Sequence, residues 1–300
     1  MQNVPRRHHY IPQFYTKQWL ANDGCLCEIS RPDGKTTKPR RTSPKGTGYE
    51  YDLYRLQHVK EELSQHTEAS FFKIVDNDGA RALRKLQPGL VDQLTADERA
   101  DWARFVLSLM IRTPRDIAAL REAWSWALRN NNEKYQARYE EMKRPEDPPT
   151  FEEFAGNHMS AGVEIGMHNA YYGLIDHEER GRVVINYHWY VLDLNESKHE
   201  LLTSDSPVGL MNFSRPDSHV SLPIGPRRLF VASKKRALIE QLLSQSHNSV
   251  ARHSNEFVAS RSMRYVYSTN DSQLRFVDRV MGSDKRPRLL EGLIQRNRFN

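Results

Sequence analysis

The chain has 300 residues, with 44 Lys and Arg against 38 Asp and Glu, so its formal net charge is +6. Hydrophobic residues make up 38% and aromatic residues 10% of it. This balance is polar for the length but too aromatic for a chain that is disordered throughout. No apolar run approaches the roughly 18 residues of a membrane span, and residues 1–9 lack the apolar core of a secretory signal. The two cysteines, Cys25 and Cys27, cannot form a disulfide framework. The composition therefore predicts a cytoplasmic protein without a membrane partner.

Positive charge is concentrated in two segments. The first contains Arg31, Lys35, Lys38, Arg40, Arg41 and Lys45 against Asp33 alone. The second contains Lys285, Arg286, Arg288, Arg296 and Arg298 against Glu291. Such segments suit contact with phosphate groups, because each neutralised phosphate releases counterions. Solvated basic loops are the alternative explanation.

Turn-forming residues dominate the chain through residue 55. Short strands are predicted at residues 25–30 and 35–39, joined by the turn Pro32-Asp33-Gly34. After residue 56 the apolar spacing becomes helical, with a break expected at Asn77-Asp78-Gly79.

Two capping boxes mark helix starts in the middle of the chain. Thr95-Ala96-Asp97-Glu98 predicts one helix start, and Pro114 is expected to kink or restart that helix. Thr150-Phe151-Glu152-Glu153 predicts a second start, directly after the proline-rich linker at residues 145–149.

The apolar period changes to two at residue 183, which predicts a half-buried strand over 183–191. Further elements are predicted in the order strand 200–203, strand 220–223, strand 229–232, helix 233–243, helix 248–261 and strand 263–268. The predicted fold class is α+β, with a predominantly helical middle, a small antiparallel sheet and an N-terminal β-hairpin region. We expect one cooperative domain over residues 1–300. Its possible subdivisions are an N-terminal hairpin segment at 1–56, a helical part at 57–178 and a sheet-plus-helix part at 179–300.

The most unusual stretch is His8-His9-Tyr10-Ile11-Pro12-Gln13-Phe14-Tyr15. Adjacent side chains of a strand point to opposite faces, so one histidine can enter a site while the other orients a group behind it. A purely structural histidine pair is the alternative. The neighbouring aromatic residues predict that this segment is ordered.

Carboxylates on the first long helix are candidate metal ligands. Glu61 and Glu68 are seven residues apart and lie on one helix face, and His58, Glu62 and His66 form a second stripe. Together with a histidine from a nearby strand they could hold a divalent metal that activates water. A solvated charged face is the alternative.

Two further segments carry candidate polar groups. Asp205, in the turn Ser204-Asp205-Ser206-Pro207, either caps the turn through backbone N–H groups or lines a cleft. The two guanidinium groups of Arg112-Thr113-Pro114-Arg115 are either a phosphate clamp or ordinary ion-pair partners.

In these same residues the chain resembles a bacterial family catalogued as domain of unknown function 4238. The resemblance rests on the opening octapeptide, on the helix that carries Glu61 and Glu68, and on Arg112-Thr113-Pro114. It continues through residues 203–207, 222–226, the helix around Asn255 and the strand Tyr265-Val266-Tyr267, with Ser206 and Ile224-Gly225 as small departures. This resemblance covers nearly the whole chain, which favours a single unit. It implies that the scattered polar positions form one recurring set, but it implies no activity.

The leading hypothesis is a metal-dependent phosphodiesterase or nuclease acting on DNA or RNA, with a toxin or phage-defence role in view. The predicted catalytic residues are His8, His9, Glu68 and Asp205. The predicted ligands of a magnesium or manganese ion are His9, Glu61 and Glu68. The predicted substrate-binding residues are Gln13, Tyr15, Lys45 and Arg112. The alternatives are a non-catalytic nucleic-acid- or protein-binding module, or an enzyme acting on a small phosphorylated metabolite. The sequence does not fix the oligomeric state.

Overall fold

The structure is a computed structural model that describes residues 6–55, 71–130, 132–175, 183–210, 213 and 215–298. The strands are β1 (Arg7–His9), β2 (Leu26–Ser30), β3 (Lys38–Thr42), β4 (Tyr49–Tyr51), β5 (His188–Asp193), β6 (Thr203–Ser204), β7 (Gly209–Leu210), β8 (His219–Gly225), β9 (Arg228–Ser233) and β10 (Val266–Ser268). The helices are α1 (Gln13–Thr16), α3 (Lys73–Leu86), α4 (Ala96–Leu109), α5 (Pro114–Asn130), α6 (Asn132–Met142), α7 (Phe151–Ile175), α9 (Arg236–Leu243), α10 (His247–Arg261), α11 (Leu274–Val280) and α12 (Leu289–Arg298). Short 3-10 turns are η1 (Lys17–Trp19), η2 (Pro44–Gly46) and η4 (Val91–Gln93). The α+β class is confirmed.

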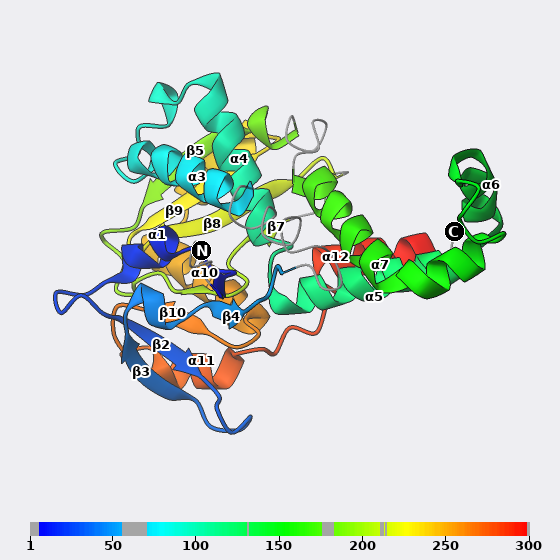
Figure 1. Ribbon diagram of the computed structural model, residues 1–300. Coiled ribbons are helices and arrows are strands. Elements are labelled where there is room, and N and C mark those ends of the chain that lie inside the picture. The colour runs from blue at the N-terminus through cyan, green and yellow to red at the C-terminus, as the bar shows by residue number, and fades with distance from the viewer. Residues whose placement is uncertain are drawn as a thin grey trace.

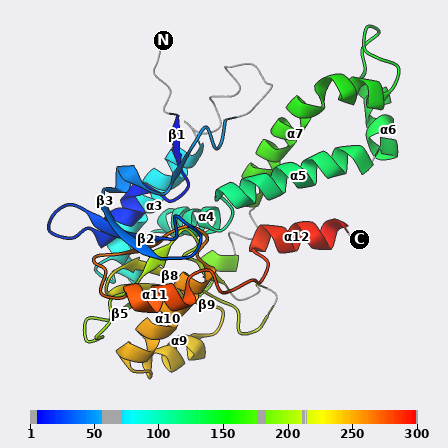
Figure 2. The same ribbon diagram turned by 90° about the horizontal axis from the view of Figure 1, so that it is seen from below.

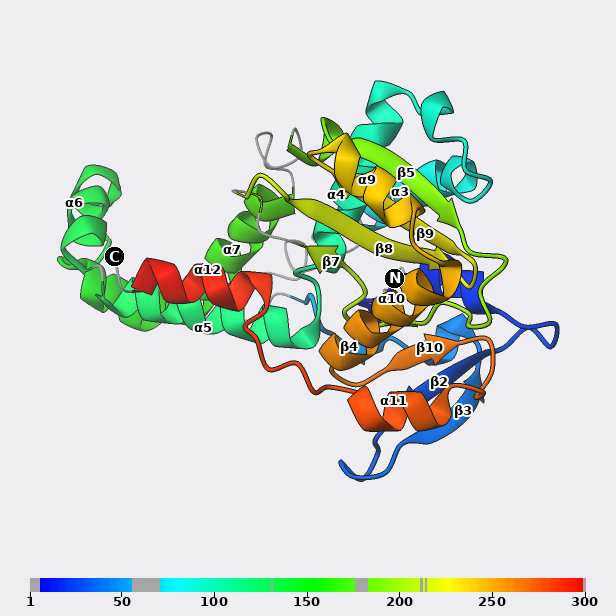
Figure 3. The same cartoon turned by 180° about the vertical axis from the view of Figure 1, so that it is seen from behind.

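Three antiparallel sheets organise the described residues. Two have four strands each, in the orders β3-β2-β10-β6 and β5-β9-β8-β7, and the third is the two-stranded ribbon β1-β4. Strand β2 pairs with β10 as well as with β3, so residues of the N-terminal region share a sheet with residues near the C-terminus. Helix α10 lies between the two four-stranded sheets (Figure 3). Its first half packs Val250 and Ala251 against the β5–β9 sheet, and its second half packs Val258 against β2 and β10.

Helices α3 and α4 cover the other face of the β5–β9–β8 sheet (Figure 1). Trp102 of α4 meets Phe230 of β9 with ring centroids 5.6 Å apart. The expected break at residues 77–79 is wrong, because α3 continues through Gly79. A Cβ atom at Gly79 would lie 2.7 Å from the ring of Phe105. The glycine therefore allows α3 and α4 to approach closely, and this packing offsets the weak helix propensity of glycine.

Helices α5, α6 and α7 reach away from the sheets as an arm, and α12 lies along α5 (Figures 1 and 2). Helix α5 begins at Pro114, where the sequence predicts a restart. Helix α7 begins after Thr150, whose Oγ1 accepts the N–H of Glu153 at 3.2 Å. No helix in the described ranges is long and apolar enough to cross a membrane.

Two predicted strands begin later than expected. Strand β3 starts at Lys38 because Asp33 Oδ1 accepts the N–H groups of Lys35 and Thr36, which holds both residues in the turn. Residues 183–185 are helical, and β5 starts at His188. There the backbone carbonyls of residues 185 and 187 accept hydrogen bonds from Arg99 rather than from a neighbouring strand. The capping box at Thr95 is confirmed in both directions.

Candidate anion-binding site

Arg112 is a buried guanidinium that joins the opening motif to the helices. Its side chain is 1% exposed, and it donates to both carboxylate oxygens of Asp76 in α3, at 2.8 and 3.1 Å. It also donates to the backbone carbonyl of His9 at 3.1 Å and lies 4.9 Å from the ring centroid of Phe72. These contacts occupy Arg112 within the protein, so its predicted role as a phosphate contact has no exposed surface to act through.

The two predicted catalytic histidines differ in their surroundings. His8 is buried, accepts the N–H of Tyr54 at 3.0 Å and stacks on the Tyr54 ring. The half-buried His9 has Nδ1 3.5 Å from Gln13 Nε2, while its Nε2 is buried and has no hydrogen-bond partner among the described residues. Burial lowers the pKa of His9, the nearby Arg112 charge lowers it further, and the adjacent backbone of Lys45 opposes this. Burial therefore favours the neutral form of the His9 imidazole.

The structure brings His9, Gln13 and Arg112 together, with Lys45 beside them on the turn η2, where its side chain is exposed. Tyr15 does not belong to this group. Its hydroxyl lies 2.7 Å from Thr203 Oγ1 and donates to the Pro223 carbonyl at 2.7 Å, fully buried in the core. Tyr15 therefore anchors α1 to the sheets.

Asp205 holds the loop between α10 and β10 in place through backbone hydrogen bonds. Its carboxylate is fully buried and accepts the backbone N–H groups of Met263, Arg264 and Tyr265 at 2.8, 2.6 and 3.2 Å. Burial raises the pKa of Asp205, while these N–H groups and the nearby Arg288 oppose the rise. Asp205 does accept backbone N–H groups, but they belong to the connection between α10 and β10 and not to its own turn, where Ser204 Oγ accepts the N–H of Ser206.

A second buried ion pair lies next to this loop. Arg288 donates to both carboxylate oxygens of Asp116 at 3.1 Å each, and to Ser206 Oγ at 3.0 Å. Asp116 also accepts the backbone N–H of Thr113 at 3.1 Å, which caps the start of α5. Residues 112–116 and 203–206, which the sequence analysis treats as separate segments, therefore meet at Arg288.

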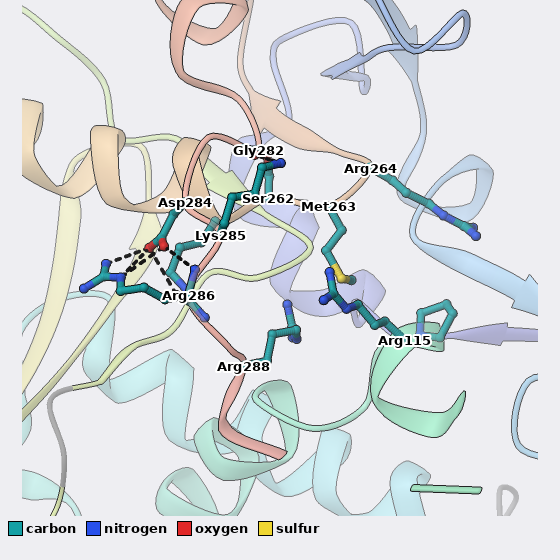
Figure 4. A pocket seen from close by; sticks show the side chains of 11 residues that line it. Arg115, Ser262, Met263, Arg264, Gly282, Asp284, Lys285, Arg286 and Arg288 are labelled. Atoms are coloured by element: carbon teal, nitrogen blue, oxygen red, sulfur yellow. Dashed lines mark hydrogen bonds and ion pairs between the residues drawn. The ribbon is translucent and has the colours of Figure 1, made fainter. Parts of the chain in front are cut away.

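These contacts support the floor of a pocket of about 500 Å³ (Figure 4). Its walls are the start of α5, the loop between α10 and β10, and the segment that leads to α12. The lining residues are Pro114, Arg115, Arg261, Ser262, Met263, Arg264, Gly282, Asp284, Lys285, Arg286 and Arg288. Six of them are cationic and one is a carboxylate. We call this cavity the basic pocket.

Most cationic side chains of the basic pocket form ion pairs with carboxylates. Asp284 accepts hydrogen bonds from Arg286 and Arg261, and these contacts hold its pKa well below the usual range. Arg264 pairs with Glu50 at 2.7 Å, and Arg115 pairs with Glu291. Lys285 donates to the Gly282 carbonyl at 2.9 Å and has no carboxylate partner in the part of the chain that is described.

The exposed side chains in this set are those available to a ligand. Arg286 is 73% exposed, Arg115 is 63% exposed and Arg264 is 52% exposed. Both side chains are exposed only in the pair of Arg264 with Glu50; such pairs are worth about 0–1 kcal/mol, so exchanging the Glu50 carboxylate for a phosphate costs little there. The carboxylate partners of Arg286 and Arg115 are 10% and 17% exposed, so these two arginines are held more firmly. Arg288, at 7% exposed, instead supports the floor. In Figure 4, Asp284 and Arg286 lie at one side of the pocket and Arg264 lies at the other.

The first basic segment of the sequence is largely neutralised by internal contacts. Arg40 pairs with Glu28 at 3.0 Å, and Arg41 pairs with Asp23. Arg31 donates to backbone carbonyls of α11 and the residue after it. Lys45 remains exposed. The C-terminal segment contributes Lys285, Arg286 and Arg288 to the basic pocket, whereas the N-terminal segment serves mainly to hold β2, β3 and α11. That either segment contacts phosphate stays a prediction.

Sequence reasoning identified Arg115 and the run from Lys285 to Arg288 but did not join them. It did not identify Arg261 and Arg264. The basic residues at both ends of Arg261-Ser262-Met263-Arg264, between a predicted helix and a predicted strand, are a signal that could have found these two.

The predicted metal ligands Glu61 and Glu68 lie outside the described residues. Among the residues that are described, no group of three or more His, Cys, Asp and Glu side chains is placed to hold a metal ion. Tyr54 and Phe72, close to the two ends of the segment that contains both glutamates, stack with ring centroids 4.6 Å apart. His8 in turn stacks on Tyr54.

Residues 7–272 match the model of a protein family that is described as a protein of unknown function, DUF4238. The chain belongs to this family. No curated protein and no solved structure matches it. The DUF4238 region includes the opening motif, Asp116, Asp205 and Arg264. It ends before the segment from Gly282 to Arg288 that completes the basic pocket.

We expect Arg112→Met to lower the free energy of unfolding by about 3 kcal/mol, because it leaves the Asp76 carboxylate partly buried without its cation. Urea unfolding measures this change. The control is Arg138→Met, which removes an ion pair whose partners are 71% and 63% exposed, and it should change stability by less than about 0.5 kcal/mol. Unchanged stability of Arg112→Met together with lost ligand binding would contradict the structural role.

The pKa of His9 is expected to lie below its usual value of about 6.5, as measured by NMR titration. The unfolded chain then binds a proton at His9 more tightly than the folded chain does. The contribution of His9 to the free energy of unfolding is therefore at its maximum above about pH 7. It decreases as the pH falls below about 6.5, until the lowered folded-state pKa is reached. His9→Gln should remove part of this decrease, whereas His253→Gln, at an exposed position on α10, should retain it. A His9 pKa at or above 6.5 would contradict the expectation.

Proposed function

We propose that the protein binds nucleic acid through phosphate groups seated in the basic pocket. The observation that carries this proposal is that six cationic side chains and one carboxylate line a single cavity. Arginine is suited to this task, because its planar guanidinium donates two parallel hydrogen bonds to phosphate oxygens. A backbone with regularly spaced phosphates can contact several of these cations in succession.

The arrangement of helices around the pocket favours an anion further. Helix α5 begins at Pro114 in the pocket wall, and α12 begins directly after Arg288. The N-terminal end of a helix carries a partial positive charge that stabilises a nearby anion by a few tenths to about 1 kcal/mol. Because Asp116 and Glu291 already accept backbone N–H groups at these two helix starts, the contribution to a ligand is at the low end of this range.

The cations are also held in place before a ligand arrives. Asp205 fixes the backbone that carries Arg264, and the buried pair of Asp116 with Arg288 fixes the segment that carries Lys285. Preorganisation of this kind reduces the entropy that is lost on binding.

The test is fluorescence anisotropy with single-stranded and duplex DNA and RNA, in EDTA, at about 50 to 200 mM salt. We expect the logarithm of the binding constant to fall linearly with the logarithm of the salt concentration. The double variant Arg115→Gln/Lys285→Gln should reduce this slope by about 2. The matched control is Arg138→Gln/Arg236→Gln, which removes the same charge at two side chains that are 71% and 79% exposed, outside the pocket lining. An equal loss of affinity in both double variants, or no binding by the wild type, would reject the proposal.

A second candidate function is metal-dependent hydrolysis of a phosphodiester bond, with His9 as the base or a metal ligand. The supporting observation is the half-buried His9 imidazole, whose Nε2 is buried and whose pKa is lowered by that burial. Glu61 and Glu68 would supply the carboxylates for magnesium or manganese, which would activate a water molecule. Such an activity is compatible with a cytoplasmic location and with a toxin or phage-defence role.

This second proposal is tested by following cleavage of labelled DNA and RNA with magnesium, manganese or EDTA. We expect metal-dependent cleavage that is abolished in His9→Gln and Glu68→Gln, while binding in EDTA is unchanged in both. The controls are His253→Gln and Glu141→Gln, at exposed positions on α10 and α6. Binding by the wild type without cleavage in either metal would reject hydrolysis and leave the binding function in place.

A further inference from the structure

One face of the β1–β4 ribbon carries a cluster of aromatic and basic side chains that no contact described above explains. In the antiparallel register Arg7 is opposite Tyr51 and His9 is opposite Tyr49. Directly opposite residues project to the same side of a ribbon, so these four side chains share one face. We call them the tyrosine face.

The tyrosine face is both exposed and rigidly held. Tyr51 is 55% exposed, and its ring is perpendicular to that of Tyr49, with centroids 5.7 Å apart. The guanidinium of Arg7 lies 5.0 Å from the centroid of Tyr49 and 5.6 Å from that of Tyr51, and it donates to the Tyr51 hydroxyl at 3.1 Å. A planar ring fixed at the surface beside a cation is the arrangement on which nucleic acid bases stack.

Glu50 connects the strand of the tyrosine face to the basic pocket. It lies between Tyr49 and Tyr51 in β4, and it pairs with Arg264 of the pocket wall at 2.7 Å. Successive side chains of a strand project to opposite faces, so Glu50 meets the pocket from the side of β4 opposite the two tyrosines. A flexible single strand that passes around the edge of β4 would contact both features, with its phosphates on one side and its bases on the other.

We infer that the protein prefers single-stranded nucleic acid, whose unpaired bases stack on Tyr51 and Tyr49 while its phosphates occupy the basic pocket. This inference rests on the proposed binding function. In a duplex the faces of the bases are stacked on one another and cannot reach a tyrosine ring, whereas the bases of a single strand are accessible. Since stacking tolerates every base, the preference concerns strandedness rather than sequence.

The experiment compares the affinities of oligothymidylate, oligouridylate, an abasic oligonucleotide of equal length and a duplex, in EDTA. We expect Tyr51→Leu to weaken oligothymidylate binding by about 5- to 100-fold and to leave abasic binding unchanged. Tyr51→Phe retains the ring and should retain the affinity. The control is Tyr190→Leu, because Tyr190 is a 41% exposed tyrosine on strand β5. Comparing the affinities of oligouridylate and oligothymidylate shows whether RNA or DNA is the tighter ligand.

The outcomes separate this inference from the proposal on which it rests. Equal wild-type affinity for abasic and base-containing strands, tighter duplex binding, or an unaffected Tyr51→Leu would overturn stacking. In each of these cases, loss of binding in Arg115→Gln/Lys285→Gln would keep the phosphate site. Absence of binding to every oligonucleotide would overturn both. Thermal unfolding of each variant shows whether a lost affinity reflects a lost fold.

Discussion

Burial of the Arg112 guanidinium constrains more of this molecule than any other single contact described here. A charged group with 1% of its surface exposed must find partners, since an unpaired charge in the interior costs several kcal/mol. Its partners come from β1, through the His9 carbonyl, and from α3, through Asp76. The position of the opening motif therefore depends on the packing of α3 and of the end of α4. This requirement ties the start of the chain to the helical layer.

The same corner of the fold supports the candidate site. Arg112 and Asp116 are four residues apart on either side of the start of α5, and each makes a buried ion pair with a distant segment. One pair points to the opening motif and the other to the basic pocket. A disturbance at Thr113 or Pro114 would therefore change the surroundings of both His9 and Arg288. The polar residues of these segments thus share a structural role that requires no shared chemistry.

Local chemistry made several elements predictable, and long-range contacts explain the rest. The capping box at Thr95 and the restart at Pro114 depend on neighbouring residues only, so the sequence was sufficient. The continuity of α3 depends on the ring of Phe105, and the helical turn at 183–185 depends on Arg99. Pattern analysis cannot see such partners.

At the candidate site, too, the sequence shows the residue types but not the distant partners that decide their roles. The sequence indicates which residues are polar and unusual, but Asp205 acquires its role from backbone groups 58 to 60 positions away. Arg112 is paired with a carboxylate 36 positions earlier. Single-sequence spacing carries no information at these separations, so the predicted phosphate clamp and the observed buried ion pair could not be told apart beforehand.

Three of the six pocket cations, Lys285, Arg286 and Arg288, lie beyond residue 272, where the family match ends. The other three, Arg115, Arg261 and Arg264, lie within the matched region, so the charge of the pocket comes from both parts of the chain. Lys285 has no carboxylate partner among the described residues, so its charge can be exchanged while the Asp205 loop and the pair of Asp116 with Arg288 stay in place. Replacing Arg288 would instead leave the buried Asp116 carboxylate without its cation. Of the three cations beyond residue 272, Lys285 is thus the one whose replacement changes the charge of the pocket at the least cost to the fold.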